Sequence, residues 1–419
     1  MNFTERRKYL ALMRRRYLEA SRAERSGLLD EMEAVTRFHR KYLIRLMQDP
    51  VALQRKPRRR ERGPVYGSNV RAAVSLIARA LDYPAAERLQ PVLRPMALLL
   101  AQQGLLQVDE DLLNQLEVIS VATTRRILDQ LPRDKPRPAA SGPRPHPAPL
   151  LKIPAGRIPW NIGEPGHFEI DLVHHCGLSA SGEYIYTLVM VDVDTGWTEL
   201  RAFLDRSYRV VEDAFRQVFR RIPFSIRELH PDNGSEFFNA HLLRFWEQHL
   251  PEATISRSRP YHKNDNRFVE ERNHTLVRSW IGDDRLDTVA QTLILNRVYD
   301  RLWVYANLFL PVMRMAEKVQ IPVEGGKFRT RRIYDRARPP LERLEEKGVI
   351  PPHQLEALKQ LRDQTNPLQL REEIYTLIEH LFSLPGATPG VTENVFETLN
   401  LPPILPEAVL APVTLSFDG

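Results

Sequence analysis

HFEIDLVHH, residues 167–175, decides the fold of the central part of this chain. Its residues alternate as in a β-strand, with Phe168 and Ile170 on one face and Glu169 and Asp171 on the other. An acid in the middle of a central strand is costly to bury unless it is paired or binds a cation. Asp171 is therefore a candidate metal ligand.

The segments that follow this strand extend the pattern into an α/β domain. YIYTLVMVDVDT and GWTELRAF indicate two more strands joined by tight connections. Residues 207–221 have the apolar spacing of an amphipathic helix. Further strands are expected at FSIRELH and ATISRS, with helices at NAHLLRFWEQHL and from NDNRFVEERN onward. The order β-β-β-α-β-α-β-α is that of a ribonuclease H-like core, a mixed sheet flanked by helices.

Two more acids have settings that match the first. In HPDNGSEF, residues 230–237, Asp232 lies in an Asn-Gly turn at the end of the fourth expected strand, whereas Glu236 is interpreted as a surface acid. Glu270 lies on the helix begun by NDNRFVEERN. The first and fourth strands are neighbours in a ribonuclease H-like sheet. Asp171 and Asp232 should therefore project side by side, with Glu270 facing them from a helix.

Three convergent carboxylates repel one another strongly at close range unless a cation neutralises them. Oxygen-rich acidic groups suit Mg²⁺ or Mn²⁺, which keep positions open for phosphate oxygens and water. Two such ions about 4 Å apart can assist both the attacking and the leaving oxygen in a displacement at phosphorus. A Cys-rich zinc site is excluded because the sequence has one cysteine, Cys176.

These residues resemble a known family. FEIDLV, HPDNGSEF and RPYHKNDNRFVEERN are similar to the D-D-E core of the retroviral-integrase superfamily and, within it, of bacterial insertion-sequence transposases. The order and spacing agree, with 60 residues between Asp171 and Asp232 and 37 between Asp232 and Glu270. The resemblance implies that these three acids are the catalytic residues and bind two Mg²⁺ ions, for which Mn²⁺ could substitute. Glu271 competes with Glu270 for the third position.

The resemblance also implies a function. A transposase of this kind binds the terminal repeats of its element, nicks the 3′ ends and joins them to target DNA by two-metal phosphoryl transfer. Its expected partners are double-stranded DNA, further copies of the chain in a dimeric or larger synaptic complex, and an accessory ATPase if one is needed. Two alternatives stay open, a ribonuclease H-like nuclease without strand transfer and an inactive DNA-binding regulator.

The N-terminal part of the chain is basic and has the pattern of short helices. Its first 63 residues hold 18 Arg or Lys against 8 Asp or Glu, which is the electrostatic footprint of a polyanion-binding segment; a solvated helical surface is the alternative. Residues 4–48 suggest a helix-turn-helix, and ISVATTRRILDQL suggests a second recognition-type helix opened by Ser120. The side chains expected to contact DNA are Arg37, Arg40, Lys41, Arg45, Arg58, Arg59, Arg60, Arg125, Arg126 and Lys263.

The sequence thus predicts a multidomain chain, with N-terminal all-α helix-turn-helix modules, a central α/β ribonuclease H-like core and a mostly helical or irregular C-terminal region. The expected segments are a helix-turn-helix module at 1–53, a basic linker at 54–65, a second helical DNA-binding module at 66–131, a Pro-rich linker at 132–160, the catalytic core at 161–320, a basic segment and helical region at 321–385, and a flexible Pro-rich tail at 386–419. The sequence shows no secretory signal and no apolar run of membrane-spanning length, so we expect a cytoplasmic, nucleoid-associated bacterial protein.

Overall fold

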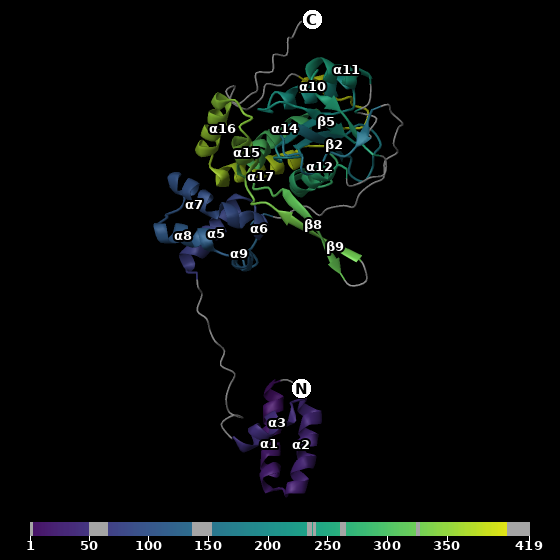
Figure 1. Ribbon diagram of the computed structural model, residues 1–419. Helices are drawn as coiled ribbons and strands as arrows, with labels where there is room; N and C mark the ends of the chain where they lie inside the picture. The colour runs from purple at the N-terminus through teal and green to yellow at the C-terminus, as the bar shows by residue number, and fades with distance from the viewer. Residues whose placement is uncertain are drawn as a thin grey trace. The chain divides into compact units, whose positions relative to one another are not determined.

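The computed structural model describes residues 3–49, 66–135, 153–232, 237, 240–259, 265–323 and 327–399. The chain divides into two compact units, Met1–Val65 and Tyr66–Gly419 (Figure 1). Among the described helices, none combines the length and the apolar character needed to cross a membrane.

The first unit is a bundle of three helices, α1 (Phe3–Glu19), α2 (Arg22–Thr36) and α3 (Arg40–Gln48). Ser21 begins α2 with a capping box, in which Ser21 and Glu24 satisfy each other's backbone N–H groups. Arg37 adopts a left-handed conformation, with φ of 59°, and turns the chain from α2 into α3. The helices enclose a small apolar core of Leu10, Met13, Tyr17, Leu29, Met32, Leu43, Leu46 and Met47.

The second unit begins with a helical block that shares one apolar core with the rest of the unit. Its elements are α5 (Ser68–Ala80), α6 (Ala86–Leu89), the 3₁₀ turn η1 (Gln90–Val92), α7 (Leu93–Gln102), α8 (Glu110–Val118) and α9 (Val121–Leu128). The expected start of α9 is confirmed, because the Ser120 side chain accepts a hydrogen bond from the Thr123 N–H.

The expected mixed sheet is confirmed and has the strand order β4-β3-β2-β5-β6. The strands are β2 (His167–His175), β3 (Ile185–Asp192), β4 (Thr198–Leu204), β5 (Glu228–Pro231) and β6 (Thr254–Ile255). The first three strands are antiparallel, whereas β5 runs parallel to both β2 and β6. A short parallel pair, β1 (Ala155–Gly156) with β7 (Arg257–Ser258), lies outside this sheet. The first and fourth strands of the predicted core are thus neighbours.

The helices of the core interrupt and flank the strands in the predicted order (Figure 1). They are α10 (Tyr208–Phe219), α11 (Ala240–His249), α12 (Arg267–Arg272), the π-helix η2 (Asn273–Arg278), α13 (Ser279–Ile281), α14 (Val289–Val304) and the π-helix η3 (Tyr305–Phe309). The long helix expected from NDNRFVEERN onward is therefore divided, with a π-helical segment after its first turns. A π-helix inside an α-helix changes the direction of the residues that follow, and such segments are frequent at functional sites.

The C-terminal region contains α15 (Pro340–Lys347), α16 (Pro352–Gln364), α17 (Pro367–Ser383) and the 3₁₀ turn η4 (Val395–Thr398). Before them stands an antiparallel hairpin, β8 (Met315–Val323) with β9 (Lys327–Tyr334), where the sequence suggested only an irregular basic segment. KFRTRRIY carries charges on both faces, so it lacks the apolar and polar alternation that identifies a half-buried strand.

The first residues of the predicted flexible tail pack against the core. The Val289 N–H donates to the Glu393 carboxylate at 2.8 Å, and the Ala387 N–H donates to Asp287 at 2.8 Å. Val395 and Leu399 lie against the main apolar cluster. Residues 386–399 are therefore attached to the core, and the remainder of the predicted tail, from residue 400, lies outside the described residues.

A buried arginine connects the helical block to the C-terminal helices. The Arg371 guanidinium on α17 donates to Asp82 and Asp134, and the Tyr375 hydroxyl also donates to Asp82. Arg371 is almost fully buried, so the pairing compensates a charge that would otherwise be strongly destabilising. Residues 66–135 and the core consequently form one compact unit.

A second buried arginine fixes the sheet to α14. Arg221 donates to Glu199 on β4 and to Asp300 on α14, each at 2.9 Å. The indole N–H groups of Trp197 and Trp303 donate to the other oxygen of Glu199. These three charges are buried, and each has a partner of opposite charge.

We predict that Arg221→Met will lower the stability of the core by about 3 kcal/mol or more, because two buried carboxylates lose their common partner. Tryptophan fluorescence during denaturant unfolding of the full chain is the measurement, since residues 1–65 contain no tryptophan. Arg301→Met is the control, because Arg301 pairs with Glu373 at a half-exposed position and such a pair contributes at most about 1 kcal/mol. Equal destabilisation by the two substitutions would contradict the assignment.

Candidate active site

Asp171 and Asp232 occupy matching positions on neighbouring parallel strands. Ile170 on β2 is opposite Pro231 on β5, so the next residues in register are the two aspartates. The Asp232 N–H donates to the Ile170 carbonyl at 3.3 Å, which continues the ladder to this point. Residues at the same register of adjacent strands project to the same face of a sheet. The strand pairing therefore brings the two aspartates together, as the sequence predicted.

The electrostatics of Asp171 indicate a third acid nearby. Burial raises the pKa of Asp171 well above its usual range, and the negative charge of Asp232 raises it further, followed by that of Glu270. Two hydrogen bonds oppose this effect, from the Leu172 N–H at 2.8 Å and from the Asn273 amide at 2.6 Å. The charges of Asp232 and Glu270 thus act on Asp171 in the folded chain, against two hydrogen bonds that lower its pKa.

The faces of α12 distinguish Glu270 from Glu271. Asn273, whose amide contacts Asp171, follows Glu270 by three residues, and residues at this spacing lie on the same side of a helix. Glu271 instead forms an ion pair with Arg88 at 2.6 Å. Burial would raise the pKa of Glu271, but Arg272 and Arg88 together lower it. Glu271 consequently has cationic partners, and Glu270 is the residue whose charge acts on Asp171.

Glu169 fixes the start of α12, a role that the sequence did not reveal. Its carboxylate accepts hydrogen bonds from the backbone N–H groups of Phe268 at 2.7 Å and Val269 at 3.0 Å. The residue is fully buried, and burial raises the pKa of Glu169 to about 8. Because Val269 directly precedes Glu270, this contact ties the helix that carries Glu270 to the strand that carries Asp171. The feature of the sequence that could have revealed this role is that Glu169 is a second acid on the same face of the strand, two residues before Asp171.

Among the residues that the structure describes, no group of three or more His, Cys, Asp or Glu side chains is placed so that it could hold a metal ion. The aspartate pair is nevertheless chemically suited to one. Its donors are carboxylate oxygens, the ligands that Mg²⁺ and Mn²⁺ prefer. Burial, followed by the charges of Asp232 and Glu270, raises the pKa of Asp171, and a bound divalent cation would act in the opposite direction.

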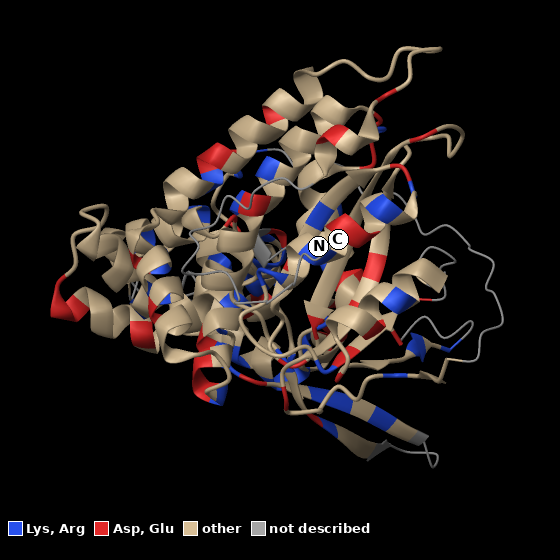
Figure 2. Cartoon of the chain, turned by 90° about the horizontal axis from the view of Figure 1, so that it is seen from above, with Lys and Arg blue, Asp and Glu red and all other residues tan. Residues whose placement is uncertain are grey.

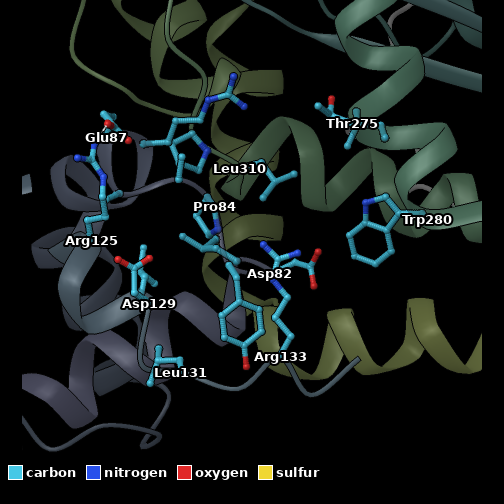
Figure 3. Close-up of a pocket in the computed structure, with 18 of the residues that line it drawn as sticks. Asp82, Pro84, Glu87, Arg125, Asp129, Leu131, Arg133, Thr275, Trp280 and Leu310 are labelled. Atoms are coloured by element: carbon cyan, nitrogen blue, oxygen red, sulfur yellow. Dashed lines mark hydrogen bonds and ion pairs between the residues drawn. The ribbon is translucent and has the colours of Figure 1, made fainter. Parts of the chain in front are cut away.

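A pocket of the second unit lies apart from these acids. Figure 3 shows this cavity of about 500 Å³, in which Asp82, Arg125 and Asp129 of the helical block face Thr275 and Trp280. None of the three carboxylates belongs to its lining among the described residues. The pocket lies behind the helix that carries Glu270, so it is separate from the acidic site.

The arginines expected to contact DNA have different surroundings. Arg40 pairs with Asp30 and donates to the Ser26 hydroxyl at 2.7 Å, while Arg45 lies over the Tyr42 ring. In the helical block Arg125 pairs with Glu87, and Arg126 donates to the Ala122 carbonyl. Arg37 and Lys41 lie at the turn into α3 and in its first turn. Arg58, Arg59, Arg60 and Lys263 lie outside the described residues.

Comparison with known proteins identifies the family. The model of the integrase core domain matches residues 163–263, a range that includes both aspartates. The uncharacterized protein y4rM of Sinorhizobium fredii is 32% identical over 339 residues, which are 80% of this chain and 92% of the relative. The chain belongs to the integrase core family. This family falls within the polynucleotidyl transferase superfamily, together with transposases and integrases.

A solved retroviral structure is also similar to part of this chain. The catalytic core domain of BIV integrase is 19% identical, and the match covers 44% of this chain and 96% of that chain with a TM-score of 0.27. Glu270 lies beyond the residues that the integrase core model matches. The prediction that Glu270 joins the aspartates is supported by the contact of Asn273 with Asp171 and by the effect of the Glu270 charge on the pKa of Asp171.

We predict that Glu169→Ala will impair DNA strand cleavage by about tenfold or more, because α12 loses the acceptor for two of its N–H groups and Glu270 is no longer held in place. Glu169→Gln keeps a carbonyl oxygen for the same donors and should retain most of the activity. The measurement is the cleavage rate of both variants, with hydrogen exchange of the Phe268 and Val269 amides as a second readout. Unchanged exchange in Glu169→Ala would contradict the positioning role.

Proposed function

We propose that the chain is a DNA transposase that binds the terminal repeats of its element, nicks their 3′ ends and joins them to target DNA. The observation that supports this proposal is that Asp171, in the middle of β2, lies in register with Asp232, directly after β5, in an integrase core, while the charge of Glu270 on α12 acts on Asp171. Chemistry on a phosphodiester needs acids that hold hard cations beside an anionic substrate, and these residues are of that type.

In this proposal Asp171, Asp232 and Glu270 would hold two Mg²⁺ ions. The ions would supply charge neutralisation for the attacking and leaving oxygens during displacement at phosphorus. The protein's own contribution is placement of the ligands. The Leu172 N–H and the Asn273 amide orient the Asp171 carboxylate, and Glu169 holds the first turn of α12.

Recognition of the element ends is assigned to the helical parts of the chain. The three-helix unit presents α3, with Arg40, Lys41 and Arg45, and the helical block presents α9, with Arg125 and Arg126. Sequence is read by side chains that reach base edges, while cations on phosphate set the register. Two ends must meet two active sites, so the working form would be a dimer or a larger assembly.

A joining assay separates this function from its alternatives. Purified protein is incubated with Mg²⁺, a supercoiled target and labelled duplexes taken from the two flanks of its own coding sequence. Joined products support the transposase. Cleavage without joining supports a nuclease, and binding without either reaction supports a regulator; both results contradict the proposal.

We predict that Asp232→Asn and Glu270→Gln will each reduce cleavage and joining on the order of a thousandfold or more, because several kcal/mol of transition-state stabilisation is lost. Binding of the ends should be nearly unchanged in both variants. Glu271→Gln is the matched control, since Glu271 pairs with Arg88 and should not be needed for the chemistry. Joining by Asp232→Asn, or a loss in Glu271→Gln as large as in Glu270→Gln, would contradict the site.

We also predict that replacing Arg40 and Lys41 with Ala will weaken end binding and lower the slope of log K against log salt by about 2, since each phosphate contact contributes about 0.9. Fluorescence anisotropy over a series of salt concentrations measures the slope. Arg15→Ala with Arg22→Ala is the control, because both side chains are exposed in the same unit but lie on α1 and at the start of α2. An unchanged slope would remove α3 from the DNA interface.

A further inference from the structure

The β8–β9 hairpin is an exposed basic ribbon to which neither the fold nor the proposed active site gives a role. Its segment, residues 315–334, contains five Lys or Arg and two Glu. Figure 2 shows Lys and Arg in a row along the hairpin, which extends away from the body of the unit. The side chains of Lys318, Arg329, Arg331 and Arg332 are exposed. Among the described residues, no carboxylate forms an ion pair with any of these four.

The cations occupy both faces of the ribbon. Lys318 is directly opposite Arg332, so these two side chains share one face. Arg329 and Arg331 alternate with Arg332 along β9 and therefore project from the other face, opposite Ile321 and Val319. A ribbon that lies flat on a protein or membrane surface needs cations on one face only. Cations on both faces fit a partner that presents anions on two sides.

The arrangement is unfavourable without such a partner. Like charges directly opposite each other in an antiparallel pair destabilise it, and Lys318 and Arg332 are placed in this way. The neighbouring cross-strand pair, Gln320 with Thr330, offers no carboxylate to compensate them. A bound polyanion would supply the missing counter-charge.

We propose that the hairpin lies in a groove of double-stranded DNA and contacts the phosphates of both walls. The DNA major groove is about 12 Å wide and admits a two-stranded ribbon. At about 3.3 Å per residue, the nine residues of β8 extend roughly 26 Å, enough to follow a groove across several base pairs. Phe328, 67% exposed near the end of the hairpin, would lie against the sugars at the far end of this contact.

The root of the hairpin places the DNA beside the acidic site. Arg314, directly before β8, lies over the Phe268 ring of α12 at 4.7 Å from its centroid. The Arg314 N–H donates to Asp335 directly after β9, and the buried Arg343 donates to both carboxylate oxygens of Asp335. One end of the hairpin thus contacts the helix that carries Glu270 through Arg314, and the other end is held by Arg314 and by Arg343 of α15. The hairpin would hold DNA on the same rigid frame as the three acids, and in this respect the inference rests on the proposed function.

The test is binding of a labelled duplex of arbitrary sequence by the full chain in the presence of EDTA, at several salt concentrations. The variant Arg329→Gln, Arg331→Gln, Arg332→Gln should lower the salt slope by about 2 to 3 and weaken binding at least tenfold at low salt. The control is Arg209→Gln, Arg244→Gln, Arg297→Gln, which removes the same charge from exposed positions on α10, α11 and α14. A parental slope in the hairpin variant, or an equal loss in the control, overturns the proposal.

A chemical cross-link tests the groove contact independently. The chain's one cysteine, Cys176, is buried, so Phe328→Cys adds a thiol that can be addressed selectively. It should form a disulfide with a duplex that carries a thiol tether in its groove, whereas Tyr208→Cys on α10 should not. Equal cross-linking of the two cysteine variants overturns the proposal. It is also overturned if the triple substitution of Arg329, Arg331 and Arg332 leaves DNA binding unchanged and alters only the oligomeric state, as measured by light scattering. EDTA suppresses strand joining, so a failure of the transposase assignment would leave these binding results interpretable.

Discussion

Two acidic side chains buried on β2 are the constraint on which the integrase core depends. Glu169 and Asp171 stand two residues apart on a central strand, and each raises the energy of the fold unless a donor or a cation meets it. Both side chains accept hydrogen bonds from the same segment of chain, residues 268–273. The N–H groups at the start of α12 bind Glu169, and the Asn273 amide binds Asp171. The contacts of Glu169 and Asp171 therefore set the position of the helix that carries Glu270.

The break in this helix has a function in the same scheme. The π-helix η2 begins at Asn273, the residue whose side chain reaches Asp171. Asn273 contacts Asp171 at the first residue of this segment, and Leu276 and Val277 further along it are buried in the core. The π-helix therefore begins where the chain passes from the acidic residues to the apolar core, and such segments are frequent at functional sites.

Much of this arrangement could be predicted from the sequence, because it follows from alternation and strand order. HFEIDLVHH identified a central strand, and the order of strands made β2 and β5 neighbours, which brings Asp171 beside Asp232. What could not be predicted depends on contacts between distant segments. Nothing local marks Arg88 as the partner of Glu271, since 183 residues separate them. The hairpin was missed for a different reason, because its charged alternation resembles a solvated loop and its strands have no apolar face.

In the proposed function, the contacts at the root of the hairpin would also limit how DNA can reach the acids. The Arg314 guanidinium donates to the carbonyls of Asp192 and Asp194 at the end of β3 and lies over Phe268 on α12. A shift of the hairpin root would therefore disturb Phe268, whose N–H binds Glu169 and which precedes Glu270 by two residues. The same displacement would move the helix that carries Glu270. In the proposed function, the hairpin and α12 would therefore align the duplex at the acids together.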